Sequence, residues 1–247
     1  MNRFSAFLTH FGISLVIFLI IGYVILYHWY PGLFFASDGG WQGIRIVALV
    51  DLVLGPTLTL CVFKAGKPGL KMDLTLIGIF QAICLAMGVF VVHAERPIAI
   101  VYSDGFFHSM TAEDYREVGF QVPDFGHLPG STPKWVTSQL PSDPYKEYEI
   151  RKEALTEDIP LRSYAQFYKA FEGSDIDAAR DSYSLEDLQE ERSAELNRFL
   201  HEHGGTADDY LYLPFGARYQ YAMIVMRKSD RSIAGSMVLN MVPAETG

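Results

Sequence analysis

LTHFGISLVIFLIIGYVILYHWY, residues 8–30, contains no Asp, Glu, Lys or Arg and is long enough to cross a membrane as a helix. About 20 helical residues at ~1.5 Å each span the ~30 Å hydrocarbon core of a bilayer. The stretch ends in Tyr27, His28, Trp29 and Tyr30, which form an aromatic belt typical of a membrane–water interface. A cleaved signal peptide is the alternative, but its apolar region would be shorter and a small residue would precede the cut. We therefore expect a first membrane-spanning helix at about residues 8–30.

Two further apolar stretches follow, at about residues 44–63 and 74–93. The short loop between them contains Lys64, Lys67 and Lys71. Lysine-rich short loops remain in the cytoplasm, so the amino terminus is also placed there. The predicted organisation is three transmembrane helices in residues 1–95 and an extracytoplasmic domain in residues 96–247.

Charge is divided unevenly between these two regions. The first 95 residues contain five Lys or Arg and four Asp or Glu, a net charge of +1, so residues 96–247 carry a net charge of −10 out of the total of −9. An acidic domain repels nucleic acid and anionic lipid, so we expect no nucleic acid as a partner. The two cysteines, Cys61 and Cys84, lie in apolar stretches, and residues 96–247 therefore contain no disulfide framework.

Asp51 is a carboxylate in the middle of the second apolar stretch. Such a residue costs ~2.5–3.5 kcal/mol on insertion and therefore faces protein or a cavity rather than lipid. Gly55 and Thr59 follow four and eight residues later, so the three residues share one helix face. Pro56 is expected to kink the helix or to free a carbonyl one turn earlier. A carboxylate, a small residue and a kink on one face resemble a surface on which another helix docks.

The pattern leaves three interpretations of Asp51 open. In the first, Asp51 is protonated or forms hydrogen bonds among the chain's own three helices. Gln81 is then the expected partner because it lies at a similar depth, ahead of Arg45 and His10. In the second, Asp51 helps to bind the transmembrane helix of another protein. The third is a proton or ion pathway, for which a second ionisable residue in mid-membrane is missing from the sequence.

Residues 96–247 are predicted to form an α+β domain with a small antiparallel sheet. The expected strands are 98–102, 135–140, 219–226 and 233–242, the last two as a hairpin. The expected helices begin at Thr111 and after Asp143, with an aromatic helix at 161–171 and a charged helix at 184–204. Residues 121–134, rich in Pro and Gly, are expected to form a loop.

Motifs that would carry chemistry are weak. His201 and His203 stand at a predicted helix end, but residues two apart point in different directions on a helix, and no nearby Cys or His completes a metal-ligand set. The sequence contains neither a Gly-x-Ser-x-Gly elbow nor a phosphate-binding glycine loop. We therefore expect no metal, no cofactor and no enzymatic activity.

The order of these features resembles the TfpX/TfpZ family of type IV pilin accessory proteins, which includes FimB-type fimbrial accessory proteins. The resemblance is dense over residues 45–105 and 210–241 and weak between them. The segments that carry it are DLVLGPTLT (51–59), FKAGK (63–67), LKMDL (70–74), Gln81, Gly88, ERP (95–97) and YLPFGAR (212–218). This resemblance implies a non-enzymatic, chaperone-like factor of the bacterial inner membrane, with a periplasmic domain, that binds a major pilin and supports fimbrial biogenesis.

The resemblance and the Asp51 face together suggest a surface that binds a partner. The residues assigned to it are Asp51, Gly55, Pro56, Thr59, Gln81 and Arg96. In this hypothesis the helices bind the transmembrane helix of the type IV pilin and the α+β domain contacts its periplasmic head. A membrane-bound envelope enzyme that acts on pilin or its glycans is the alternative. A sensor is a third class, but about seven residues before the first span leave no room for an output module.

Overall fold

The computed structural model describes residues 2–239, which divide into two compact units. We call residues 1–35 and 39–96 the helical unit, and residues 36–38 and 97–247 the α/β domain. The short segment Ala36–Asp38 belongs to the α/β domain although it lies between two helices of the other unit in the sequence. The two units are therefore connected by three passages of the chain.

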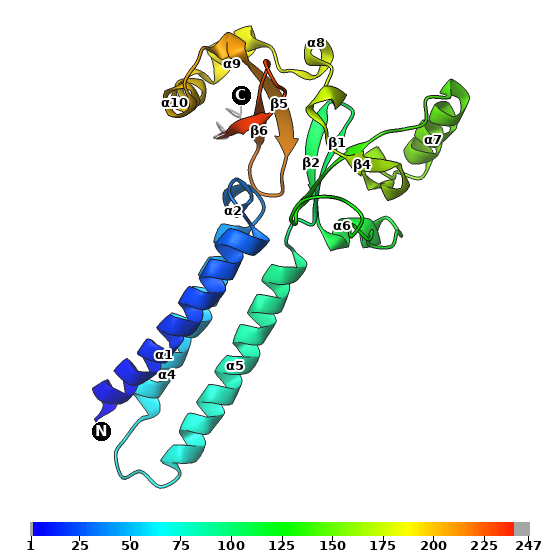
Figure 1. Ribbon diagram of the computed structural model, residues 1–247. Coiled ribbons are helices and arrows are strands. Elements are labelled where there is room, and N and C mark those ends of the chain that lie inside the picture. Colours follow the sequence, from blue (N-terminus) through cyan, green and yellow to red (C-terminus); the bar gives the residue numbers. More distant parts are fainter. Residues whose placement is uncertain (1, 240–247) are drawn as a thin grey trace, which may run out of the picture. The chain divides into compact units, whose positions relative to one another are not determined.

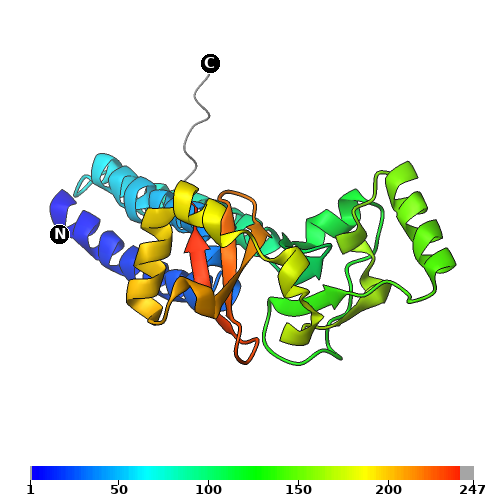
Figure 2. The ribbon, with the colours of Figure 1, turned by 90° about the horizontal axis from the view of Figure 1, so that it is seen from above.

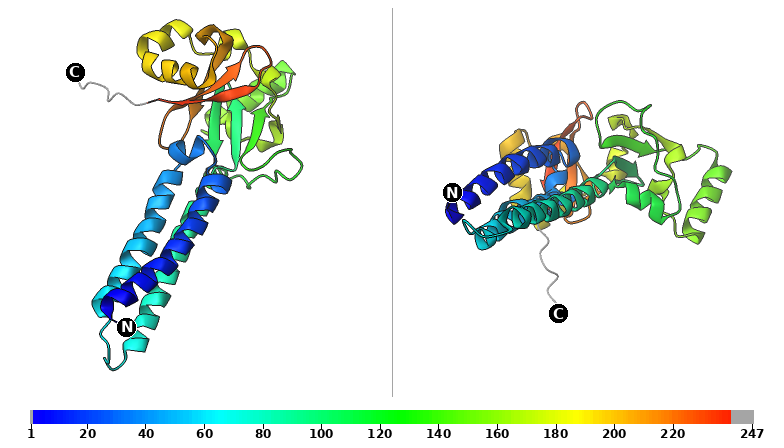
Figure 3. Two further views of the ribbon diagram at one scale, coloured as in Figure 1. Left: turned by 60° about the vertical axis from the view of Figure 1, so that its left-hand side comes forward. Right: turned by 90° about the horizontal axis from the view of Figure 1, so that it is seen from below.

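The helical unit contains three helices that are long and apolar enough to cross a membrane, Arg3–Trp29, Gly40–Val62 and Leu70–Ala94 (Figure 1). The three long apolar helices are confirmed, and each begins slightly earlier than the predicted span. The first consists of α1 (Arg3–Val24) and a π-helical turn (Ile25–Trp29). The second consists of α3 (Gly40–Ala48), a π-helical turn (Leu49–Leu54) and α4 (Gly55–Val62), and the third is α5 (Leu70–Ala94). A short helix, α2 (Phe34–Ser37), lies between the first two. The amino-terminal end of α1 and the loop between α4 and α5 lie at the same end of this unit (Figure 3).

The second span changes its hydrogen-bond pattern next to Pro56. The Gly55 N–H donates to the carbonyl of Val50, five residues earlier, at the end of the π-helical turn. Pro56 has no N–H to offer the carbonyl of Leu52, and a π-helical turn is a common way for a helix to absorb such a local mismatch. The disturbance predicted for Pro56 is thus a wider turn that contains Asp51.

Small residues allow α3 and α5 to approach closely. A Cβ atom at Gly43 would lie 2.7 Å from Cγ1 of Val92, and one at Gly88 would lie 3.4 Å from Cγ2 of Ile46. Tyr30 is buried beside them, and its hydroxyl donates to the carbonyl of Val92 at 2.8 Å. Close approach at small residues is a main source of helix association in membranes.

Replacing Gly43 by alanine is expected to destabilise the helical unit by about 1–2 kcal/mol, because the new methyl group overlaps the side chain of Val92. The measurement is the unfolding free energy in detergent micelles titrated with a denaturing detergent. Gly78→Ala in α5 is the matched control, because no heavy atom lies within 4 Å of its Cβ position, and alanine there is expected to be neutral or stabilising. Equal effects of the two substitutions would contradict the packing described.

The α/β domain is built on a seven-stranded sheet in the order β4-β3-β1-β2-β5-β6-β7. Its strands are β1 (Ala99–Ser103), β2 (Phe106–Met110), β3 (Lys134–Ser138), β4 (Tyr168–Ala170), β5 (Tyr210–Gly216), β6 (Ala222–Arg227) and β7 (Ile233–Val238). The predicted fold class, three transmembrane helices followed by a domain of helices and strands, is confirmed. The sheet is larger than expected and mixed, because β1–β3 and β2–β5 are parallel pairs while the other pairs are antiparallel.

Helices border this sheet, and α7 and α10 lie toward opposite ends of the domain (Figure 2). The helices are α6 (Ala112–Glu117), α7 (Pro144–Thr156), α8 (Ala178–Asp181), α9 (Leu185–Glu191) and α10 (Ser193–His203). Two predicted starts are confirmed. The Thr111 side chain accepts from the backbone of Asp114 at the start of α6, and Asp143 accepts from the first N–H groups of α7.

Three predictions for this domain need correction. Residues 161–171 form two short 3-10 turns (Leu161–Ser163 and Ala165–Phe167) followed by β4, because their aromatic side chains pack on both faces of the sheet rather than along one helix face. The predicted helix at 184–204 is broken at Arg192, whose φ of −136° is not helical. The predicted strand 233–242 ends at Val238, and residues 240–242 lie outside the described residues.

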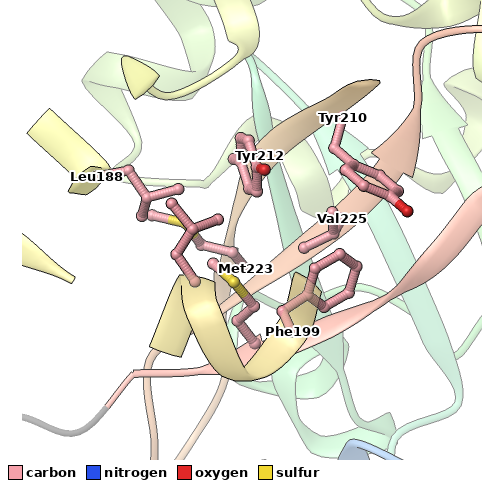
Figure 4. Packing of buried hydrophobic residues seen from close by; sticks show 8 residues of the cluster. Leu188, Phe199, Tyr210, Tyr212, Met223 and Val225 are labelled. Atoms are coloured by element: carbon pink, nitrogen blue, oxygen red, sulfur yellow. The ribbon is translucent and has the colours of Figure 1, made fainter. Parts of the chain in front are cut away.

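Two hydrophobic clusters cover the same face of the sheet. The strand register places Val101 opposite His108, and His108 opposite Gly216, so that alternate residues of β1, β2 and β5 point to one side. The cluster under α6 and its following loop contains Ile98, Ala99, Val101, Met110, Tyr115 and Val136. The cluster under α9 and α10 contains Leu188, Leu196, Phe199, Tyr210, Tyr212, Met223, Val225 and Met237 (Figure 4).

Aromatic rings cover the opposite face of β1, β2 and β3. Phe107 is fully buried at their centre, with its ring centroid 5.0 Å from that of Tyr102, 5.2 Å from Phe171 and 5.6 Å from Trp135. Edge-to-face and tilted pairs at these separations add to the stabilisation that burial provides. Phe107 therefore joins β1, β2, β3 and the chain after β4.

Candidate functional site

Asp51 lies at the centre of a buried polar cluster formed by all three spans of the helical unit. The hydroxyl of Ser14 donates to Oδ1 of Asp51 at 3.0 Å, and Nε2 of Gln81 donates to the same oxygen at 2.6 Å. Nε2 of Gln81 also lies 3.2 Å from Oγ of Ser14. The predicted pairing of Asp51 with Gln81 is confirmed. Sequence reasoning missed Ser14, whose only signal is a small polar side chain within an apolar stretch.

Gly55 makes room for this cluster. A Cβ atom at Gly55 would lie 1.8 Å from Oε1 and 2.3 Å from Cδ of Gln81. The glycine thus lets the Gln81 amide reach across to Asp51, one turn earlier on the same helix face. Pro56 beside it is buried as well. The sequence assigned Gly55 to a partner-binding face. In the structure, the space beside Gly55 is filled by the side chain of Gln81.

Thr59 forms a second polar contact between two spans. Its Oγ1 lies 2.6 Å from Nδ1 of His10 on α1. Asp51, Gly55 and Thr59 therefore share one buried helix face, as their spacing predicts, and that face contacts α1 and α5. Binding of a partner helix to this face stays a prediction. In this conformation α1 or α5 would have to move aside to admit it.

The cluster has more hydrogen-bond acceptors than donors. Both N–H groups of the Gln81 amide and the hydroxyl of Ser14 have acceptors within the cluster. Oδ2 of Asp51 and Oε1 of Gln81 are buried and have no hydrogen-bond partner among the described residues. Buried acceptors without a donor are costly, above all in a membrane. The cluster can therefore hold three helices in register and accept a donor from a further group.

Arg96 lies apart from the other residues assigned to the partner-binding surface. It follows the end of α5, where its Nη1 donates to the carbonyl of His93 at 2.5 Å. Fifteen residues separate it from Gln81, about 22 Å along a helix. A cation at the carboxyl end of a helix is favourable because it satisfies the last carbonyls. The structure thus assigns Arg96 to the end of its own helix and does not bring it to the Asp51 cluster.

A second buried carboxylate, Asp38, belongs to the α/β domain. It is 4% exposed and accepts hydrogen bonds from the hydroxyls of Ser37 and Ser109 and from the backbone of Arg218. The backbone N–H of Tyr219 donates to the carbonyl of Ser37 at 2.8 Å. These contacts join a loop between the first two spans to β2 and to the segment after β5. Sequence reasoning missed this site because no local pattern links residues so far apart in the chain.

Burial raises the pKa of Asp38, although the hydrogen bonds from Ser109, Ser37 and the Arg218 backbone and the charge of Arg218 act in the opposite direction. Because the folded pKa lies above the unfolded one, the contribution of Asp38 to stability is complete below about pH 4 and is lost as the pH rises through the raised pKa. We expect the unfolding free energy of the wild type, relative to Asp38→Asn, to fall over this range. Thermal or urea unfolding at a series of pH values measures it, and parallel curves for the two proteins would contradict it.

A polar cavity of about 540 Å³ opens where β1 and β3 end. Arg151 pairs there with Asp104 at 3.1 Å and with Glu147 at 2.9 Å, and Lys169 pairs with Asp175 at 2.6 Å. The Lys169 ammonium and the Thr137 hydroxyl help to hold the pKa of Asp175 below its ordinary value despite the opposing effect of burial. Both cations are paired with carboxylates, so the contacts hold together the loops around the ends of β1 and β3.

Comparison with known proteins gives one informative relationship. No family model matches the chain, and no solved structure matches it. The chain is 26% identical over 172 residues to the fimbrial assembly protein, serogroup E1, of Dichelobacter nodosus. The match covers 68% of this chain and spans 60% of the length of that protein. With its three long apolar helices, the chain is a multi-pass membrane protein that is distantly related to a fimbrial assembly protein.

Proposed function

We propose that this protein is a non-enzymatic accessory factor of the TfpX/TfpZ kind that binds a type IV pilin in the bacterial inner membrane and supports pilus assembly. The observation that carries the proposal is the relationship to a fimbrial assembly protein in a chain with three membrane-spanning helices. The segments around Asp51 and before β6, on which the family resemblance rests, support the same assignment.

The Asp51 cluster supports a role of the helices in binding as well as in anchoring. A carboxylate in mid-membrane is costly, and neutral polar side chains can also hold helices in register. The two unpartnered oxygens, Oδ2 of Asp51 and Oε1 of Gln81, would accept hydrogen bonds from a polar group on a partner helix. We propose that the pilin transmembrane helix lies against the second span, next to this cluster, after a small movement of α1 or α5.

The proposal places the amino terminus and the loop between α4 and α5 in the cytoplasm, and the α/β domain in the periplasm beside the pilin head. The three lysines of that loop support this orientation. It can be tested by single-cysteine labelling in a Cys61→Ser, Cys84→Ser background, because these are the two cysteines of the chain. A membrane-impermeant thiol reagent should label a cysteine at exposed Tyr145 in intact spheroplasts and should not label one at Lys67. The reverse pattern would contradict the orientation.

Deletion of the gene in a piliated bacterium tests the function. We expect surface pili to be lost or strongly reduced while pilin remains in the inner membrane, because assembly rather than pilin synthesis needs the protein. A plasmid copy of the wild-type gene should restore piliation. Unchanged piliation after deletion would contradict the proposed function.

A further inference from the structure

The face of the sheet that holds the two hydrophobic clusters is open between them. A pocket of about 470 Å³ lies there, over β2, β5 and β6 of the α/β domain. In the strand register His108 lies opposite Gly216, and Pro214 lies opposite Met223, so these residues of β2, β5 and β6 are on this face. Side chains that line the pocket include Phe106, His108, Tyr183, Pro214, Met223 and Leu239.

The pocket is predominantly apolar. Phe106 and Tyr221 at its edge are 49% and 58% exposed, which is unusual for two large rings beside one cavity. Burial lowers the pKa of His108 to about 4, so its imidazole is neutral at pH 7. A pocket of this size and composition suits an apolar group, since binding sites of 300–1,000 Å³ are typically lined in this way.

The edge of the pocket formed by α9 is strongly acidic. This short helix exposes Glu186, Asp187, Glu190 and Glu191, and Glu191 also lines the pocket. Arg192, which follows α9, is the one basic side chain of the lining. The concentrated negative charge repels fatty acids and anionic phospholipids and attracts positively charged groups. Exposed Tyr and Phe next to such charge are typical of the residues that dominate protein–protein binding.

We propose that this pocket binds an apolar side chain of a partner protein that is flanked by Lys or Arg residues, which face the carboxylates of α9. The proposal rests on the proposed function, in which the partner is the periplasmic head of the pilin. Phe106 and Tyr221 enclose the inserted side chain, and Glu186 and Glu190 contact the flanking cations. A lipid or a small acidic molecule does not satisfy these charges.

The test uses full-length protein in nanodiscs of zwitterionic lipid and the purified soluble head of the major pilin of the same bacterium. Affinity is measured by biolayer interferometry for the wild type and for Phe106→Ala, Tyr221→Ala and Glu186→Lys/Glu190→Lys variants. We expect each aromatic substitution to weaken binding by at least about tenfold. The double charge reversal should weaken binding several-fold at low salt and reduce its dependence on ionic strength.

Matched controls lie on α7, at the other end of the domain. Tyr145→Ala and Tyr148→Ala remove rings that are 74% and 61% exposed, and Glu149→Lys/Glu153→Lys reverses two exposed charges. These controls should leave the affinity unchanged. Because all substituted side chains are largely exposed, unfolding curves should stay close to that of the wild type.

The outcomes separate the two proposals. If the wild type binds the pilin head and the pocket and α9 variants bind it with the same affinity, the pocket is not the binding site, but the proposed function still stands. Absence of binding by the wild type would overturn the contact between the domain and the pilin head, and the pocket assignment with it. A lipid that co-purifies with the wild type in native mass spectrometry and is lost from Phe106→Ala would also overturn the proposal.

Discussion

Replacing Gln81 by leucine is expected to destabilise the helical unit by about 2–3 kcal/mol. The substitution removes the donor 2.6 Å from Oδ1 of Asp51 and leaves the buried carboxylate with Ser14 alone. Removing one partner of a buried polar pair leaves the other without that hydrogen bond and out of reach of water, which is the main source of the loss. The unfolding free energy in detergent micelles and the steady-state amount of protein in the membrane both measure the effect.

The double substitution Asp51→Leu/Gln81→Leu is the informative control. It removes the carboxyl group and the amide together, so neither is left buried without the other and much of the lost stability should return. If the double variant is as unstable as Gln81→Leu alone, the cost does not come from the unpaired carboxylate. A double variant that is stable but fails to support piliation would separate a binding role of Asp51 from its role in helix register.

Replacing Phe107 by alanine is expected to destabilise the α/β domain by about 3–5 kcal/mol, because the ring is fully buried among three other aromatic side chains. A domain of this size has a total stability of about 5–15 kcal/mol. We therefore expect partial unfolding at physiological temperature. Urea denaturation followed by the fluorescence of Trp135, in a Trp29→Phe, Trp41→Phe background, measures the loss directly next to the substituted ring.

Phe106→Ala is the matched control for this prediction. Phe106 is the neighbouring residue of β2, but it points to the opposite face and is 49% exposed. Its replacement should cost less than about 1 kcal/mol. Similar losses for the two variants would show that the aromatic face around Phe107 does not form the core assigned to it.

The helical unit could be predicted from sequence because membranes impose length and polarity on each span. Residue spacing also placed Asp51, Gly55 and Thr59 on one face, and depth identified Gln81 as the partner of Asp51. Residue spacing and depth do not distinguish a face that contacts the chain's own helices from one that contacts another protein. The structure shows internal contacts, because Gly55 leaves space that the Gln81 side chain fills.

The α/β domain was less predictable because its pairings are distant in sequence. Strands β2 and β5 are parallel neighbours about 100 residues apart, and no local pattern specifies that pairing. The aromatic spacing at residues 161–171 is compatible with a helix, yet tertiary packing draws Tyr168 to one face of the sheet and Phe171 to the other. The contact of Asp38 with Ser109 likewise joins residues 71 positions apart in the chain, which no local pattern specifies.

Asp38 connects the loop between the first two spans to the α/β domain, to which residues 36–38 belong. The loop between the first two spans contributes one acidic residue, and β2 and the segment after β5 supply its partners. The YLPFGAR segment that resembles pilin accessory proteins thus ends in Arg218, whose backbone N–H holds Asp38. Arg218 therefore helps to hold the loop between the first two spans against this segment.

Pilin binding by the helical unit can be tested by site-specific photo-cross-linking in living cells. A photoreactive amino acid is placed at half-buried Leu58 or at exposed Val53, both in the second span near the Asp51 cluster. We expect irradiation to produce an adduct with the major pilin from at least one of these positions, and we expect Asp51→Leu/Gln81→Leu to reduce the amount of this adduct. Adducts confined to the protein's own helices at both positions would contradict pilin binding by the helical unit.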